Sequence, residues 1–334
     1  MQAAIYGFGG LELTPDEAKF FRDAQPAGYI LFRRNIESPE QLRRLTDSLR
    51  ALEGHDEVPI LIDQEGGRVA RMRPPVWPAF PSGEAFDRLY KVAPSSAIEA
   101  ARVNARALGL MLNEAGVTVN CMPMLDVRQP GASDIIGDRA LGSEPMQVSA
   151  LGRAQLDGLA SAGVIGVIKH IPGHGRALVD SHHELPFVTA SEEQLAIDLE
   201  PFERLRDAPM GMVAHVVFEA WDERPASQSP KVISDIVRGR IGFDGFLMSD
   251  DSNMNALTGT LGERAAACVA AGCDVALPCD GVLANNIDVA KAVPALTAEG
   301  EVRLARAMAM RFTPNDEMDF AEAVAKRDAL LALV

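Results

Sequence analysis

The chain of 334 residues has few cysteines, few aromatic side chains and no long uninterrupted apolar run. Its four cysteines form no CxxC pair, so neither a disulfide framework nor a cysteine-based zinc site is expected. No segment approaches the roughly 18 apolar residues of a transmembrane helix, and the N-terminus lacks the basic region and the cleavage site of a signal peptide. These absences lead us to expect a cytoplasmic protein with no membrane association.

Positive charge is also scarce. There are 32 Lys and Arg against 47 Asp and Glu, which gives a formal net charge of −15. Binding to nucleic acid or to an anionic membrane requires a basic face, so neither partner is expected. An anionic small molecule remains possible, because it would meet a local arginine rather than the net charge.

The apolar residues that are present form short segments, each followed by an amphipathic or Ala-rich stretch. This alternation predicts an α/β fold, a (β/α)₈ or TIM barrel, as a single domain over residues 1–334 with a C-terminal helical extension from about residue 313. A doubly wound open sheet is the alternative, but no GxGxxG follows a strand to favour it. The expected strands are residues 3–9, 28–32, 58–63, 117–126, 164–169, 210–218, 245–250 and 274–278.

Charged and imidazole side chains stand at the ends of five successive predicted strands. The C-terminal ends of barrel strands face one side of the molecule, where such barrels keep their active sites. Side chains alternate along a strand, so Asp250 is expected to point into the mouth and Asp251 to cap the following helix. The strand-end residues are Asp63, Glu65, Arg68, Arg71, Asp126, Asp138, Arg139, Lys169, His170, His215, Asp250 and Asp251.

Residues 168–186 hold four of the six histidines of the chain. His170 and His174 are four residues apart, as in an HExxH metal site, but Pro172 and Gly173 break the helix that such a site needs, so no metal is expected. Asp180 lies two residues before His182. A carboxylate in this position can orient an imidazole and raise its basicity for proton transfer, although a loop histidine with a purely structural role is the alternative.

Five motifs in this order, IDQEGGRV, IGDRALG, KHIPGHG, DSH and MSDD, resemble those of glycoside hydrolase family 3. Within that family the chain is similar to the cytoplasmic bacterial β-N-acetylglucosaminidases of peptidoglycan recycling, over residues 6–281. The resemblance implies a retaining hydrolase without cofactor or metal. It would release non-reducing terminal GlcNAc that is β-1,4-linked to 1,6-anhydro-N-acetylmuramic acid, with or without a stem peptide.

The same resemblance implies roles for single residues. Asp250 matches the nucleophile, His182 the general acid/base and Asp180 its partner, whereas His174 matches a loop histidine with a structural role. The sugar-binding positions are matched by Asp63, Arg71, Arg139, Lys169 and His170. Two motifs depart from the common pattern, because Ile171 replaces the usual aromatic residue and Ser252-Asn253 replaces Leu-Ser; neither departure changes a catalytic residue.

Three alternatives remain at this point. A histidine acid/base is neutral when it is not protonated and repels anions less than a carboxylate would, so phosphate could attack the intermediate and the enzyme would be a phosphorylase. A β-glucosidase of the same family is a second alternative. A non-catalytic sugar-binding protein is the third, and Asp250, Asp180 and His182 argue against it. We expect a monomer that acts on a small-molecule substrate.

Overall fold

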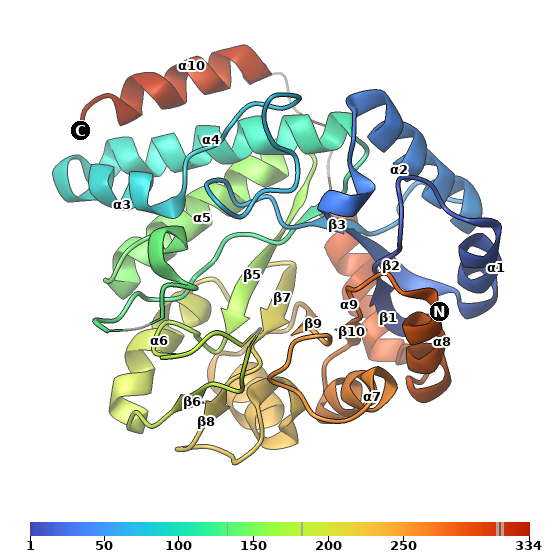
Figure 1. Cartoon of the computed structure of the whole chain (residues 1–334). Coiled ribbons are helices and arrows are strands. Elements are labelled where there is room, and N and C mark those ends of the chain that lie inside the picture. The colour runs from blue at the N-terminus through green and yellow to red at the C-terminus, as the bar shows by residue number, and fades with distance from the viewer. Residues whose placement is uncertain (132, 182, 312–313, 315–316) are drawn as a thin grey trace.

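The protein is a closed barrel of parallel strands surrounded by helices (Figure 1). The computed structural model describes residues 1–131, 133–181, 183–311, 314 and 317–334. Within these residues, eight strands close the barrel in the order β1-β10-β9-β7-β5-β4-β3-β2. The prediction of a (β/α)₈ barrel is therefore confirmed.

The bounds of the elements follow the chain. The barrel strands are β1 (Gln2–Tyr6), β2 (Pro26–Leu31), β3 (Ile60–Ile62), β4 (Val119–Asn120), β5 (Ile165–Ile171), β7 (Met210–Val213), β9 (Phe246–Asp251) and β10 (Val275–Leu277). The helices are α1 (Pro15–Ala24), α2 (Pro39–Glu53), α3 (Gly83–Val92), α4 (Pro94–Glu114), α5 (Pro145–Ser161), α6 (Glu192–Arg204), a π-helix (Val232–Arg240), α7 (Leu261–Ala271), α8 (Leu283–Ala292), α9 (Ala298–Ala309) and α10 (Phe320–Leu331). Short 3₁₀ helices span Arg33–Asn35, Gly137–Arg139 and Ala226–Gln228.

Local sequence accounts for where the helices begin. Thr14 caps α1, where its hydroxyl accepts a hydrogen bond from the Glu17 N–H and the Glu17 carboxylate accepts one from the Thr14 N–H. Pro15 follows in the first turn, where its missing N–H costs nothing. Ser38 caps α2 in the same position relative to Pro39.

Several predicted strands are shorter than expected, and the fourth and the sixth differ most. The fourth was predicted over residues 117–126, but β4 ends at Asn120. Pro123 lacks an N–H and interrupts the ladder, although Leu125 still donates to the Lys169 carbonyl at 2.6 Å. The sixth was predicted over residues 210–218, but it divides into β7 in the barrel and β8 (Val217–Phe218), which pairs outside the barrel with β6 (Phe187–Val188).

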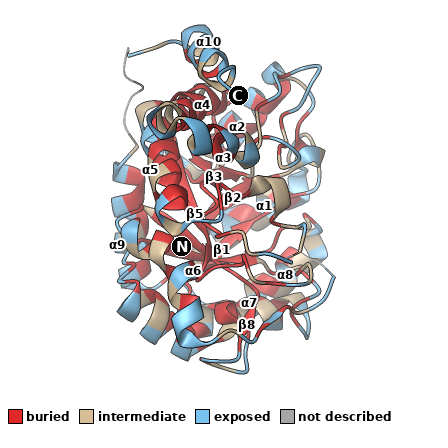
Figure 2. Ribbon diagram, turned by 90° about the vertical axis from the view of Figure 1, so that its left-hand side faces the viewer, coloured by how far each residue is buried: buried red, intermediate tan, exposed pale blue. Residues whose placement is uncertain are grey.

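The barrel strands are buried on both faces, and exposed residues lie on the outer faces of the helices (Figure 2). Helices α4 and α5 pack closely, since a Cβ added at Gly158 would lie 2.2 Å from the Arg102 carbonyl oxygen. The N-terminal end of the barrel is closed by backbone bonds from Ala3 to the Pro294 carbonyl and from Leu296 to the Met1 carbonyl.

The last helix, α10, lies across the outer face of α4 (Figure 1). Ala323 and Arg327 are its buried residues, and the Arg327 guanidinium stacks on the Phe80 ring at 5.3 Å and donates to Asn104 at 3.3 Å. The expected start of the C-terminal extension, near residue 313, lies outside the described residues. No helix of the described part of the chain is both long enough and apolar enough to cross a membrane.

Candidate active site

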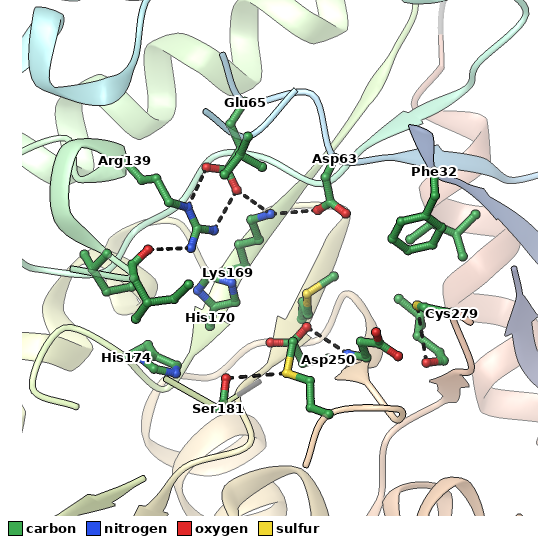
Figure 3. A pocket seen from close by; sticks show the side chains of 18 of the residues that line it. Phe32, Asp63, Glu65, Arg139, Lys169, His170, His174, Ser181, Asp250 and Cys279 are labelled. Atoms are coloured by element: carbon green, nitrogen blue, oxygen red, sulfur yellow. Dashed lines mark hydrogen bonds and ion pairs between the residues drawn. The ribbon is translucent and has the colours of Figure 1, made fainter. Parts of the chain in front are cut away.

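The C-terminal ends of the barrel strands surround a cavity of about 190 Å³ (Figure 3). Segments that are far apart in sequence meet there, as is expected at this end of such a barrel. Phe32, Met212 and Leu277 supply apolar parts of the wall. The polar lining consists of Asp63, Glu65, Arg71, Arg139, Lys169, His170, His174, Ser181, Asp250 and Asp251.

One side of the cavity is a charged cluster of Asp63, Glu65, Arg71, Arg139 and Lys169. The Lys169 ammonium lies 3.0 Å from an Asp63 oxygen and 2.7 Å from a Glu65 oxygen. The Arg139 guanidinium donates two hydrogen bonds, of 2.8 and 2.9 Å, to the Glu65 carboxylate. Arg71 donates to the second Asp63 oxygen at 3.1 Å. Each buried charge therefore has an opposite charge beside it, as burial requires.

These contacts set the protonation states in the cluster. Burial alone would raise the pKa of Asp63, but Lys169 and Arg71 lower it to about 2. Burial also opposes ionisation of Glu65, yet Arg139 and Lys169 hold its pKa well below the usual range. For Lys169 burial lowers the pKa, but Glu65 and Asp63 outweigh it and keep the ammonium charged. The cluster is thus fully ionised at neutral pH.

A buried carboxylate, Asp126, stands behind His170. It accepts a hydrogen bond from His170 Nδ1 at 2.6 Å and one from the backbone N–H of His174 at 2.6 Å. Burial would raise the pKa of Asp126, but His170 and these hydrogen bonds hold it below its usual range. An ionised carboxylate can only accept, so we assign the ring proton to Nδ1, which leaves Nε2 of His170 as the free ring nitrogen.

Asp250 lies near the end of β9 and faces the cavity with 8% of its surface exposed. One carboxylate oxygen accepts a hydrogen bond from the Asp251 N–H at 2.8 Å. Burial would raise the pKa of Asp250, but His170 and His215 lower it below the usual range. An anionic carboxylate at a cavity can attack an electrophilic carbon or stabilise a developing cation.

His215 supports the strand that carries Asp250. It is fully buried, its Nε2 lies 3.0 Å from the Asp251 carbonyl oxygen, and its Nδ1 lies 2.6 Å from the Ser227 hydroxyl. Burial lowers the pKa of His215, against the attraction of Asp250. A neutral ring fits these contacts if Nε2 donates to the carbonyl and Ser227 donates to Nδ1.

The segment between β5 and β6, here called the 172–186 loop, covers another side of the cavity. Asp180 is half-buried on it, and Ser181 lines the cavity with its hydroxyl 3.4 Å from the Met254 sulfur. His182 lies outside the described residues. His174 also lines the cavity, and burial, assisted by His170, lowers the pKa of its ring to about 4, which keeps it neutral.

The cavity offers no arrangement typical of a metal centre in the described part of the chain. No three His, Cys, Asp or Glu side chains converge there in a way that could hold an ion. His170 and His174 lie side by side with ring centroids 5.8 Å apart, but the Nδ1 atom of His170 is already engaged with Asp126.

Six of the eight residues to which the sequence assigned a catalytic or sugar-binding role line this one cavity, namely Asp63, Arg71, Arg139, Lys169, His170 and Asp250. The prediction that Asp251 caps the next helix is wrong. Thr260 caps α7, and Asp251 also lines the cavity. The sequence analysis assigned no role to three further residues of the site, Glu65, Asp126 and His215. Their position at strand ends was the only indication in the sequence that they could belong to the site. The partners of Asp126 and His215 are distant in sequence, so spacing could not reveal them.

The family of the chain follows from comparison with known proteins. A model described as the glycosyl hydrolase family 3 N terminal domain matches residues 8–311. The chain belongs to this family. The beta-hexosaminidase of Bordetella avium is 37% identical over 276 residues, which are 81% of this chain and 78% of the relative. That of Chromobacterium violaceum is 40% identical over 281 residues, covering 81% of this chain and 76% of the relative.

A solved structure agrees with these relatives. Native NagZ from Neisseria gonorrhoeae is similar with a TM-score of 0.87 and 31% identity, covering 99% of this chain and 98% of that one. The expected family and the expected barrel are thereby confirmed. The chain is a family 3 β-N-acetylhexosaminidase of the NagZ type.

Proposed function

We propose that this hydrolase is a retaining β-N-acetylglucosaminidase of peptidoglycan recycling. Its substrates would carry a non-reducing terminal GlcNAc joined β-1,4 to 1,6-anhydro-N-acetylmuramic acid, with or without a stem peptide. The motifs of the chain and its beta-hexosaminidase relatives support this activity. All four cysteines are free and buried, which is compatible with the reducing cytoplasm where we propose the enzyme acts.

The observation that carries the mechanism is Asp250, an anionic carboxylate at the cavity with an oxygen not used by Asp251. In the first step this oxygen would attack the anomeric carbon while the glycosidic oxygen leaves with a proton from His182. In the second step His182 would take a proton from water, whose oxygen displaces Asp250 from the sugar. Two displacements at one carbon retain its configuration.

Asp180 would orient the His182 ring and stabilise it when it is protonated, in the manner of a carboxylate–histidine pair. His182 can serve as both acid and base because the ordinary pKa of an imidazole, about 6.5, lies near neutrality. The role differs from that of the usual second carboxylic acid of glycosidases, whose pKa must be raised by burial.

The charged cluster would hold the sugar hydroxyls. Lys169 uses two of its three N–H groups on Asp63 and Glu65, which leaves one for a substrate oxygen. Each Asp63 oxygen accepts one bond within the protein and has a further lone pair. His170 would offer Nε2 from a ring fixed by Asp126. The cluster thus keeps donors and acceptors in place before substrate arrives, which reduces the entropy lost on binding.

The test is steady-state hydrolysis of 4-nitrophenyl β-N-acetylglucosaminide and of GlcNAc–1,6-anhydro-N-acetylmuramic acid. NMR should detect the β-anomer as first product, and mass spectrometry of a trapped glycosyl-enzyme should find the sugar on Asp250. GlcNAc-1-phosphate formed only with added phosphate would instead show a phosphorylase. Faster turnover of the β-glucoside would show a glucosidase, and binding without turnover would contradict catalysis altogether.

A further inference from the structure

The ring of His174 is a buried polar group whose hydrogen-bonding capacity is not used within the protein. The residue is 3% exposed, and its hydrogen bond to Asp126 comes from the backbone N–H and not from the ring. No other residue in the described part of the chain forms a hydrogen bond with either ring nitrogen. Buried polar side chains nearly always have a partner, so an exception at a cavity indicates a partner that arrives with the substrate.

The position of this ring is fixed before any substrate binds. The His174 N–H donates to Asp126 at 2.6 Å, and the ring packs against the His170 ring with centroids 5.8 Å apart. The backbone beside it also leaves no room for movement, since a Cβ added at Gly175 would lie 2.0 Å from the Val127 carbonyl oxygen. A side chain held in this way loses little entropy when it binds a ligand.

The edge of the ring that meets the cavity is the one that carries Nε2. The Nδ1 atom is enclosed by protein, whereas the residue lines the cavity, and Figure 3 shows its ring at the cavity wall beside His170. The ring is also close enough to Asp250 to be attracted by its carboxylate. A substrate atom bound to His174 would therefore lie near the sugar carbon that Asp250 attacks.

We propose that His174 binds the 2-acetamido group of the substrate through Nε2 and thereby favours N-acetylglucosamine over glucose. This group is attached to the carbon next to the anomeric one, so it lies beside Asp250 in the reactive complex. An amide offers one N–H donor and one carbonyl acceptor, so it can pair with Nε2 in either tautomer of the ring. The proposal rests on the proposed function, because it requires a sugar whose anomeric carbon lies at Asp250.

The charge state of His174 suits an amide. Burial, assisted by the charge of His170, lowers the pKa of His174 to about 4, so the ring is neutral at pH 7. A neutral ring and a neutral amide can be buried together at a small desolvation cost, provided that they form a hydrogen bond. The acetyl methyl group also needs an apolar wall, and the cavity supplies apolar side chains, among them Ile135, Ile136 and Met254.

The test compares aryl β-N-acetylglucosaminides with the aryl β-glucosides that carry a 2-hydroxyl instead. Each series runs from 2,4-dinitrophenol, which departs without protonation, to phenol, which needs it. His174→Phe keeps a ring against His170 but removes both nitrogens, and it should lower kcat/KM about tenfold for every N-acetylglucosaminide. The glucosides lack the acetamido group, so their slower hydrolysis should stay within about twofold of the wild-type value.

Two further variants identify the nitrogen. The side-chain amide of His174→Gln reaches the position of Nε2, whereas that of His174→Asn reaches only the position of Nδ1. The glutamine should recover most of the preference for the N-acetyl sugar, and the asparagine should recover none. His55→Phe is the matched control, because His55 is an exposed histidine in the segment before β3, and it should leave both substrate series unchanged.

Equal losses on both sugars in His174→Phe would show that the ring only supports His170, and would overturn the proposal. Unchanged hydrolysis of the N-acetylglucosaminides, or recovery by asparagine instead of glutamine, would overturn it as well. A loss that grows as the leaving group becomes poorer would assign His174 to proton transfer and not to the acetamido group. In all these cases wild-type preference for the N-acetyl sugar would still uphold the proposed function, which faster wild-type hydrolysis of the glucosides would contradict.

Discussion

The two sides of the cavity are held in different ways. On the strand side, charged side chains from β3, β5 and the segment before α5 neutralise one another, and Lys169 alone joins two carboxylates. On the loop side, the backbone leaves the barrel and is held by the Arg176–Asp198 ion pair and by backbone hydrogen bonds such as those accepted by the Ala177 and Ser181 carbonyls. Buried ion pairs therefore fix the strand side, whereas the loop side depends largely on backbone hydrogen bonds.

The largest expected effect separates the chemistry of the two sides. Asp250→Asn removes the proposed nucleophile and should lower kcat/KM by at least about 10⁴-fold for every leaving group. His182→Ala on the loop should instead slow poor leaving groups far more than activated ones, because only the former need protonation. The aryl glycoside series measures both. A loss that depends on the leaving group in Asp250→Asn would contradict its role.

Stability gives the next largest difference. Lys169→Met leaves two buried carboxylates with one cation fewer and should lower the free energy of unfolding by about 3 kcal/mol. Lys19→Met is the control, since Lys19 pairs with Asp23 on the surface of α1, and it should change stability by less than about 0.5 kcal/mol. Urea unfolding measures both variants, and similar losses would show that the charged cluster does not stabilise the fold more than a surface ion pair does.

Asp126→Asn should affect both sides at once, because Asp126 contacts the His170 ring and the backbone of His174. The two bonds go to different carboxylate oxygens, and an asparagine keeps an acceptor at only one of these two positions. The loss of a charged hydrogen bond of about 1.5–2 kcal/mol predicts a roughly tenfold to thirtyfold lower kcat/KM even for the dinitrophenyl glycoside. If Asp126→Asn slowed only substrates with poor leaving groups, Asp126 would act through the proton donor on the 172–186 loop and not through His170.

The pH dependence of stability should have opposite signs on the two sides. Asp63, with a pKa of about 2 in the folded chain and about 4 in the unfolded one, contributes about 2 kcal/mol that is present above pH 4 and lost as pH falls towards 2. Asp198, with a pKa of about 6, takes up its proton in the folded state first, so its contribution increases as pH falls from 6 towards 4. The urea midpoint of unfolding should be measured between pH 7 and pH 3. In Asp198→Asn the increase in stability between pH 6 and pH 4 should disappear, whereas the decrease in stability at lower pH should remain.

The sequence predicted the barrel because its signals are local. Apolar segments, caps such as Thr14 and motifs at strand ends are each read within a few residues. The sequence also identified six residues that line one cavity in the structure. It failed where the outcome depends on tertiary contact: the 210–218 strand divided because part of it pairs with β6, and Asp251 lines the cavity while Thr260 caps the helix. Arg176–Asp198 joins residues 22 positions apart, and no spacing rule pairs them.

The smallest expected effect concerns Ser227 on the strand side. Ser227 does not line the cavity, but it contacts His215, which supports the strand that carries Asp250. Ser227→Ala removes the hydroxyl 2.6 Å from His215 Nδ1, while His215 Nε2 still reaches the Asp251 carbonyl. A net hydrogen bond of about 1 kcal/mol predicts a roughly fivefold lower kcat, equal for all leaving groups, because the strand carrying Asp250 and not the proton donor is loosened. Ser234→Ala, on the exposed surface, is the control. A loss confined to poor leaving groups would show that Ser227 acts through the loop, and the separation of the two sides would then be wrong.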